Sequence, residues 1–163
     1  MPTSAKRRQR AFDSPCQEAY LNLWRTYDRL RAMEDELFAQ SDLTAQQYNA
    51  LRLLRGQQPK PLATLDIARR LISRAPDITR LLDKLEQRGL IVRQRLSANR
   101  RVVQVSITSA GLDLLSELDA PVRRCHEKQL GHLSGEQVTQ LIELLKMARQ
   151  PHEEIEGSWP RGG

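Results

Sequence analysis

The chain has 163 residues, which suits one domain or one core with appended helices, and its 4% aromatic content favours helical packing. Its net charge of +6 indicates an acidic partner, either nucleic acid or a membrane surface. No apolar run approaches the roughly 20 residues of a membrane-spanning helix, the basic start has no apolar stretch behind it, and two cysteines form no disulfide framework. We therefore expect a cytoplasmic protein with reduced thiols that does not act at a membrane.

The N-terminal part predicts a basic flexible arm over residues 1–12, followed by a long helix over residues 14–40. Aromatic residues and leucines recur at helical spacing along this helix, among them Tyr20, Trp24 and Tyr27. A helix of about 26 residues is about 39 Å long. That is more than one small domain needs to cover its own core, so the pattern hints at a partner chain.

A second helix starts sharply at Thr44, which has the N-cap position of a capping box with Gln47. We expect this helix to end at Gly56. After a Pro-containing loop, Thr64 is predicted to cap a short third helix that ends at Leu71.

The fourth helix is predicted to begin near Pro76, which suits a first helical turn, and to end at Gly89, a natural C-cap. Its apolar residues lie on one face. Residues 90–95 and 102–107 then read as two strands of a hairpin, joined by the loop 96–101.

Two more helices follow. Thr108 caps the fifth, and Ser134 forms a second capping box with Gln137 at the start of the sixth, which ends near Pro151. Residues 153–163 are polar and rich in Gly and Pro, so we predict a flexible tail.

Positive charge is concentrated in the centre of the chain. Residues 69–101 hold ten Lys or Arg against three Asp or Glu, a net charge of +7, so the remainder of the chain sums to −1. Most charge runs are solvated surface. Here the charge coincides with a helix-turn-helix and a hairpin, and this combination is typical of a protein that reads duplex DNA.

Several side chains of this unit are candidates for DNA contact. Arg80 can pair with a guanine edge, Thr79 can touch a thymine methyl or a phosphate, and Lys84 suits a phosphate, whereas Asp77 is a weaker candidate. An arginine at the hairpin tip can enter a narrow minor groove. Alternation along the strand predicts that one of Arg100 and Arg101 points outward while the other braces the loop. The DNA-binding candidates are Arg74, Pro76, Thr79, Arg80, Lys84, Arg95, Asn99, Arg100 and Arg101.

The order of these segments resembles a known family. LTAQQYNALRLL, LDIARRL, DITRLLDKLEQRGLIVR, NRRVVQVSIT and SAGLDLL follow one another as in the MarR (multiple antibiotic resistance regulator) transcription factors. The resemblance covers about residues 21–145. It implies a mainly α fold: a winged helix-turn-helix with a two-stranded β wing, and long N- and C-terminal dimerisation helices.

The resemblance also implies an organisation and a function. Residues 43–107 would form the DNA-binding domain, with the fourth helix as the recognition helix, and residues 13–42 and 108–152 would form the dimerisation region. The homodimer would bind a pseudo-palindromic operator in double-stranded DNA and repress nearby genes. One position departs from the family pattern, because Asn99 stands where an Asp-x-Arg motif has its aspartate. Asn99 can accept a hydrogen bond in the loop but cannot form an ion pair there.

Two kinds of sensor remain open. Cys16, at the start of the first helix, is a candidate redox residue, although it lies about one turn upstream of the cysteine that peroxide-sensing relatives use. Cys125 is expected to be a packing residue. Relatives also bind aromatic or phenolic anions between the dimerisation helices and the winged helix, although aromatics at helical spacing more often belong to a core. The candidate ligand-pocket residues are Trp24, Tyr27, Tyr48 and Arg52.

We predict neither a metal nor a cofactor, because His126, His132 and His152 have no zinc-like spacing and no phosphate-binding loop is present. With no nucleophile elbow or catalytic dyad, we do not expect an enzyme. We expect a sequence-specific, dimeric repressor relieved by a small aromatic ligand. The alternatives are a non-specific architectural DNA-binding protein and a redox-sensing repressor that uses Cys16.

Overall fold

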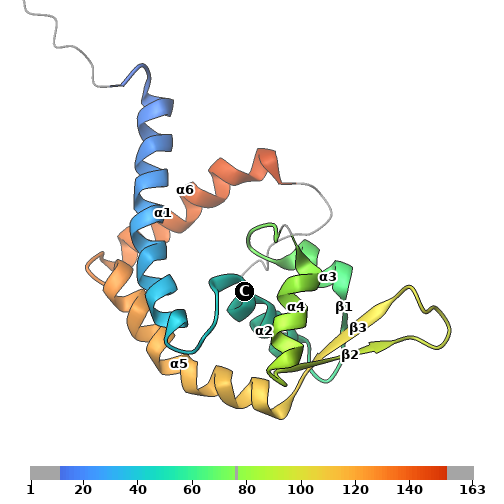
Figure 1. The fold of residues 1–163 in the computed structure, drawn as a ribbon. Coiled ribbons are helices and arrows are strands. Elements are labelled where there is room, and N and C mark those ends of the chain that lie inside the picture. Colours follow the sequence, from blue (N-terminus) through green and yellow to red (C-terminus); the bar gives the residue numbers. More distant parts are fainter. Residues whose placement is uncertain (1–11, 76, 154–163) are drawn as a thin grey trace, which may run out of the picture.

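The computed structural model describes residues 12–75 and 77–153. Pro76 lies outside the described residues, as do the predicted arm and the predicted tail except for residues 12 and 153. The chain is mainly helical, with one small antiparallel sheet (Figure 1). Its elements in chain order are α1 (Pro15–Ala39), α2 (Ala45–Gln57), β1 (Leu62–Ala63), α3 (Thr64–Arg70), α4 (Ile78–Gln87), β2 (Ile91–Arg95), β3 (Val103–Ile107), α5 (Ser109–Leu130), α6 (Gly135–Arg149) and the 3₁₀ turn η1 (Gln150–His152).

Two groups of elements are visible in Figure 1. The elements α2, α3, α4 and the sheet form one group, and the hairpin of β2 and β3 projects from it. The long helices α1 and α5 pack against each other beside this group. The N-terminal half of α1 extends beyond the rest of the chain.

A shared core joins the first group to α1 and α5. Leu51 of α2, Leu82 of α4, Val105 of β3 and Leu115 of α5 are all fully buried. Phe38 of α1 enters the same core, where its ring stacks on Tyr48 at a centroid distance of 4.4 Å. The end of α1 therefore belongs to the packed domain, although its beginning does not.

The predicted helix starts are confirmed at Thr44, Thr108 and Ser134. Both capping boxes are complete: the Thr44 and Ser134 hydroxyls each accept from the backbone N–H three residues on, and each glutamine side chain accepts in return. Gly89 also ends α4 as predicted, with a φ of +68° that a side chain would disfavour.

Three local predictions are wrong. Helix α2 continues through Gly56 to Gln57, because a glycine lowers helix propensity without forbidding a helix. Thr64 is the first residue of α3 and not its cap, and its hydroxyl donates instead to the Val103 carbonyl at 3.4 Å. Helix α4 begins at Ile78, later than predicted, with Asp77 as its N-cap.

The sheet has a third strand that the sequence did not predict. β1 pairs with β3, giving the strand order β1-β3-β2, with Leu62 opposite Val105. The projecting hairpin itself is two-stranded, as expected, and pairs Ile91 with Ile107 and Arg95 with Val103. A strand of two residues carries no period-2 pattern, so its existence depends on the tertiary contact with β3.

Helix α6 buries none of its side chains, and the N-terminal half of α1 is similarly uncovered. Among the described residues, each helix is too short or too polar to span a bilayer. The large apolar residues exposed on these two helices are Tyr20, Leu21, Leu23, Trp24 and Tyr27 on α1, and Ile142, Leu144 and Met147 on α6.

Candidate DNA interface

The helix-turn-helix is held together by side chains of α2 that point at the turn between α3 and α4. The Asn49 Oδ1 atom accepts from the Ile72 N–H at 3.0 Å. The Gln46 amide donates to the Arg74 carbonyl at 3.2 Å and to the Ser73 hydroxyl at 3.3 Å. Gln46 and Asn49 were not among the predicted site residues, although two amide side chains three positions apart lie on one face of a helix, which was a usable signal.

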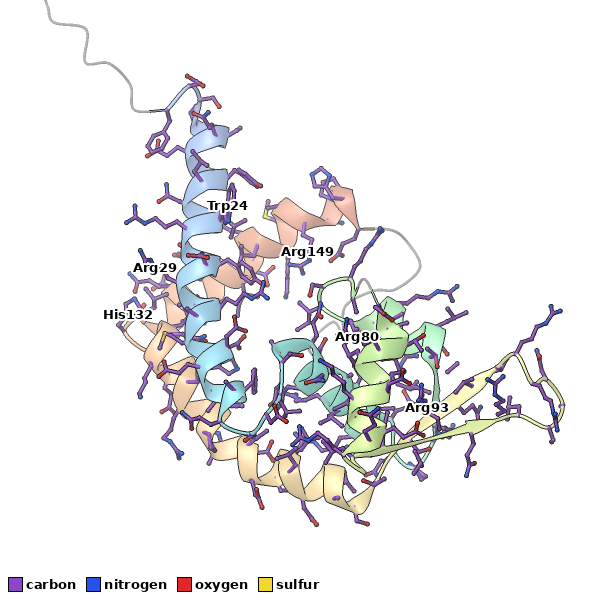
Figure 2. All side chains as sticks on the ribbon, in the orientation of Figure 1. Trp24, Arg29, Arg80, Arg93, His132 and Arg149 are labelled. Carbon is purple, nitrogen blue, oxygen red and sulfur yellow. The ribbon has the colours of Figure 1, made fainter. Side chains whose placement is uncertain are left out.

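Helix α4 presents two different faces. Leu81, Leu82 and Leu85 are buried in the core, whereas Thr79, Arg80 and Lys84 are exposed. Asp77 starts this helix by accepting the Arg80 N–H at 2.9 Å, so its carboxylate is engaged in capping. Thr79 and Arg80 are therefore exposed in the first turn of α4, whose start is capped by Asp77. Figure 2 shows Arg80 on this helix.

The loop between β2 and β3 is braced by hydrogen bonds. The Asn99 N–H donates to the Leu96 carbonyl at 3.2 Å, and the Val102 N–H donates to the Asn99 carbonyl at 3.0 Å. The Asn99 side chain accepts from the Arg101 N–H at 3.2 Å, so it supports the loop without an ion pair. These bonds fix the arginine-rich tip at the end of the hairpin.

The bracing arginine differs from the prediction. Arg95 donates to the Arg100 carbonyl at 3.1 Å. Both Arg100 and Arg101 are exposed, and neither side chain makes a hydrogen bond with any described residue. The alternation rule holds within paired strands, whereas both arginines lie in the loop beyond the last pair of residues. Two unpaired cations are therefore available at the tip.

Two carboxylates of α4 pair with Arg93, so its charge does not add to the exposed positive charge of this unit. It donates to Glu86 through Nε at 3.0 Å and through Nη2 at 2.6 Å, and Nη2 also contacts Asp83. The hydrogen bond from Arg93 lowers the pKa of Glu86 and raises that of Arg93. Figure 2 shows Arg93 at the base of the hairpin, where it joins β2 to α4. Two of the three acidic residues in the +7 segment thus share one arginine as their ion-pair partner.

The predicted DNA contacts are distributed over three neighbouring pieces of this unit. Arg74 precedes α4; Thr79, Arg80 and Lys84 lie on α4; Arg95, Asn99, Arg100 and Arg101 belong to the hairpin. All eight are exposed, and the ninth, Pro76, lies outside the described residues.

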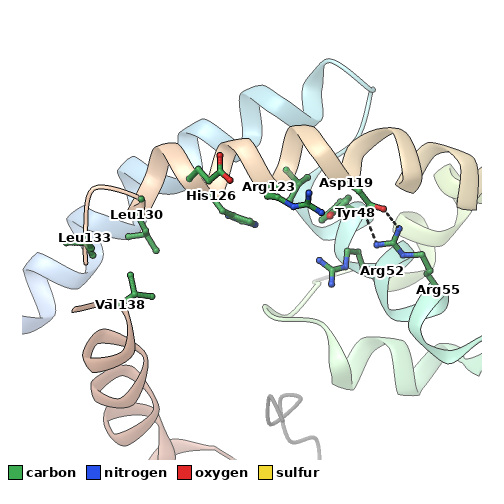
Figure 3. A pocket seen from close by; sticks show the side chains of 12 residues that line it. Tyr48, Arg52, Arg55, Asp119, Arg123, His126, Leu130, Leu133 and Val138 are labelled. Carbon is green, nitrogen blue, oxygen red and sulfur yellow. Dashed lines mark hydrogen bonds and ion pairs between the residues drawn. The ribbon is translucent and has the colours of Figure 1, made fainter. Parts of the chain in front are cut away.

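A pocket lies between α2, α5 and the start of α6, with a volume of about 720 Å³. Figure 3 shows a charged end, where Arg52 and Arg55 of α2 face Asp119 and Arg123 of α5. The other end is apolar. The remaining lining residues are Tyr48, Val122, His126, Glu127, Leu130, Gly131, Leu133 and Val138.

A bidentate ion pair crosses the charged end of this pocket. The Arg55 guanidinium donates to both Asp119 oxygens, at 3.0 and 2.9 Å (Figure 3). This hydrogen bond lowers the pKa of Asp119, and the nearby charges of Arg52 and Arg123 act in the same direction. The two residues are 64 positions apart in the chain, so no sequence motif could have identified the pair.

Only two of the four candidate ligand-pocket residues line this pocket. Tyr48 and Arg52 line the pocket, whereas Trp24 and Tyr27 are exposed on α1 and do not line it.

Cys16 is exposed, and Cys125 is buried, as expected for a packing residue; burial raises the pKa of its thiol. Within residues 12–75 and 77–153, no cluster of three or more His, Cys, Asp or Glu could hold a metal ion.

Comparison with known proteins places this geometry in one family. The family model described as MarR family matches residues 43–103. A MarR transcription factor from Planctomyces limnophilus has a crystal structure with 59% sequence identity, a TM-score of 0.68 and coverage of 83% of this chain and 98% of its own. The S. aureus MepR–DNA complex has 26% identity, a TM-score of 0.69 and coverage of 81% and 96%.

A third structure shares the fold. It describes the regulation of DNA binding of Bordetella bronchiseptica BpsR by 6-hydroxynicotinic acid, and it has 24% identity, a TM-score of 0.73 and coverage of 80% of this chain and 98% of its own. The matched family segment spans the helix-turn-helix and most of the hairpin. The chain therefore belongs to the MarR family of winged-helix transcription regulators.

Proposed function

We propose that this protein is a homodimeric, sequence-specific repressor that binds a pseudo-palindromic operator in double-stranded DNA and acts in the cytoplasm as a binding protein, not as an enzyme. The observation that carries the proposal is the set of exposed basic residues on α4 and the hairpin, on a unit whose acidic residues are partly neutralised. MepR, at 26% identity, has been solved in complex with DNA.

The proposed reading of DNA uses α4 and the hairpin in different grooves. The exposed face of α4 enters the major groove, where Arg80 pairs with a guanine edge and Thr79 contacts a thymine methyl. Lys84, one turn further along, contacts a phosphate. The unpaired Arg100 and Arg101 at the hairpin tip are attracted by the negative potential of a narrow minor groove.

The exposed apolar residues of α1 and α6 support the homodimer. Tyr20, Trp24 and Tyr27 are each more than half exposed, on a helix segment that extends beyond its own domain. Large apolar side chains in such numbers indicate an interface. A second copy supplies a matching surface through a two-fold axis, and this symmetry matches a pseudo-palindromic DNA site.

The pocket between α2 and α5 is the proposed ligand site. The pocket as a whole has three arginines against Asp119 and Glu127, so it favours a small anion, and its apolar end suits an aromatic ring. Because α2 carries the amides that hold the helix-turn-helix, a ligand that displaces α2 from α5 would also displace α4. The control of BpsR by an aromatic acid supports this class of ligand.

The ligand proposal is tested with 6-hydroxynicotinate as the probe. Titration of the protein–operator complex with this acid should release the DNA, and Arg52→Ala should shift the midpoint to higher concentration. Arg69→Ala, on the exposed face of α3, removes the same charge away from the pocket and should leave the midpoint unchanged. Identical midpoints for Arg52→Ala and wild type, or no release at all, would argue against this ligand class at this pocket.

The DNA proposal is tested by selection of binding sites from random duplexes, followed by footprinting at about 150 mM salt against excess random DNA. We expect two protected half-sites about one helical turn apart. Binding that random DNA competes away would indicate the architectural alternative, for which phosphate contacts alone suffice.

A further inference from the structure

The turn between α1 and α2 is closed by backbone hydrogen bonds and flanked by buried side chains. The N–H groups of Ser41 and Leu43 both donate to the Phe38 carbonyl at 3.0 Å, and Asp42 adopts a left-handed conformation with a φ of +51°. Phe38 and Leu43 are buried on either side of the turn. The carbonyls of Ser41 and Asp42 are therefore presented at the end of α1 in a fixed orientation.

Arg88, the C-cap of α4, binds both of these carbonyls. Its Nη1 atom donates to the Asp42 carbonyl at 2.6 Å, and its Nη2 atom donates to the Ser41 carbonyl at 3.0 Å. Two donors of one planar guanidinium fix a direction as well as a distance. The C-terminal end of α4 is therefore connected to the turn that follows α1, across 46 positions of sequence.

The rest of α4 is anchored by other contacts. Its leucines are buried in the core that α1 and α5 share, and Arg93 connects it to β2. The Gly89 carbonyl that follows α4 accepts from the hydroxyl of Thr108, the N-cap of α5, at 2.6 Å. The Arg88 contact differs from these because it reaches the turn that follows α1, the helix that carries the exposed apolar stripe.

We propose that Arg88 is a positioning residue that fixes α4 relative to α1 and thereby sets the distance between half-sites that the dimer accepts. The inference rests on the proposed function, in which α1 pairs the two copies and α4 reads DNA. If the link is lost, each α4 remains folded and still reads its half-site. The two reading helices are then held less firmly at one separation, so a change in half-site spacing is tolerated better.

The test measures spacing discrimination. Duplexes recovered by selection with wild-type protein are rebuilt with one base pair inserted at the dyad, which moves the half-sites apart by about 3.4 Å and rotates them by about a tenth of a turn. The readout is the ratio of dissociation constants for the inserted and original duplexes. Loss of folded protein lowers binding to both duplexes equally, so it does not change this ratio.

Two variants distinguish the effect of the paired hydrogen bonds of Arg88 from the effect of its charge alone. Arg88→Lys keeps the charge but loses the planar fork, and Arg88→Gln loses both. We expect the discrimination ratio to fall by about tenfold in each variant, the size of effect that follows from loss of hydrogen bonds to a charged group. Arg69→Gln removes a charge from an exposed position of the same unit and should keep the wild-type ratio.

Each result has a distinct meaning. A wild-type ratio in Arg88→Lys with a reduced ratio in Arg88→Gln would show that Arg88 acts through its charge, and would overturn the proposal. Wild-type ratios in both variants would overturn it as well. Failure of the wild-type protein itself to select a site with two half-sites would instead refute the proposed function, independently of Arg88.

Discussion

The winged-helix unit of residues 43–107 and the helices α1 and α6 differ in how far they bury their apolar residues. Residues 43–107 place Leu51, Leu82 and Val105 in a core where each is fully buried. Helix α6 buries none of its side chains, although it begins with a complete capping box and carries apolar residues along its length. Contacts within a single chain therefore account for the packing of residues 43–107. Helix α6 has the sequence of a stable helix but buries no side chain within this chain, which supports the proposed second copy.

The largest expected effect comes from placing a charge on the uncovered helices. Trp24→Asp on α1 and Leu144→Asp on α6 should each convert the dimer to monomer, and raise the dimer dissociation constant by about 10³-fold or more. A symmetric interface would bury two new carboxylates, each at a cost of several kcal/mol. Sedimentation velocity over a range of protein concentrations measures the change.

Gln140→Asp is the matched control for the α6 variant, because it adds one charge at an exposed polar position of the same helix. It should remain dimeric. If Trp24→Asp and Leu144→Asp also remain dimeric, neither helix pairs the copies where we place the interface.

A smaller effect is expected in the packed region. Leu82→Ala should lower the free energy of unfolding by about 2 to 5 kcal/mol, because it leaves a cavity in a core with no exposed area at that residue. Urea unfolding should give the same loss at two protein concentrations, since the cavity lies within one chain. Leu65→Ala, at a position that is 67% exposed, should change stability by less than about 0.5 kcal/mol. Equal effects of the two variants would contradict the core described here.

The smallest effect concerns the ion pair that joins the two regions. The pKa of Asp119 is lowered in the folded protein by its hydrogen bond to Arg55, so this pair stabilises the fold above the unfolded-state pKa of Asp119. That contribution is lost as the pH falls through the lower, folded-state value. Asp119 is 45% exposed, so we expect less than about 1 kcal/mol.

The measurement is the loss of stability on acidification from about pH 5 to about pH 3. Wild type should lose more stability than Asp119→Asn. In an Arg55→Gln background most of this difference should be lost, because the hydrogen-bond partner of Asp119 is absent and only the charges of Arg52 and Arg123 remain. A difference of unchanged size without Arg55 would assign the acid sensitivity to another interaction.

Local signals in the sequence predicted much of the fold. Both capping boxes, the glycine that ends α4 and the paired strands of the hairpin lie where the patterns place them. The predictions failed for elements whose position depends on tertiary contacts. β1 has only two residues and depends on β3, and Thr64 is the first residue of a helix, where its hydroxyl reaches the Val103 carbonyl.

The candidate site was predictable in composition but not in its pairings. Residue type and helical spacing identified Thr79, Arg80 and Lys84 on the face of α4 that is exposed. Charge counting could not distinguish Arg93, which two carboxylates neutralise, from Arg100 and Arg101, which are exposed at the tip. Nor could it find the pocket, because the segments that line it are far apart in the chain and meet only in the folded protein.

The central claim is that the exposed face of α4 reads sequence, and Arg80→Ala tests it most directly. Dissociation constants are measured at about 150 mM salt for a selected operator and a random duplex. We predict that wild type prefers the operator by about 10³-fold or more. The variant should lose about 1 to 3 kcal/mol for each half-site of the operator and relax the preference at one base position in each half-site, with little change on the random duplex. An equal loss on both duplexes would contradict the account, because Arg80 would then be a phosphate contact and α4 would not read the base there.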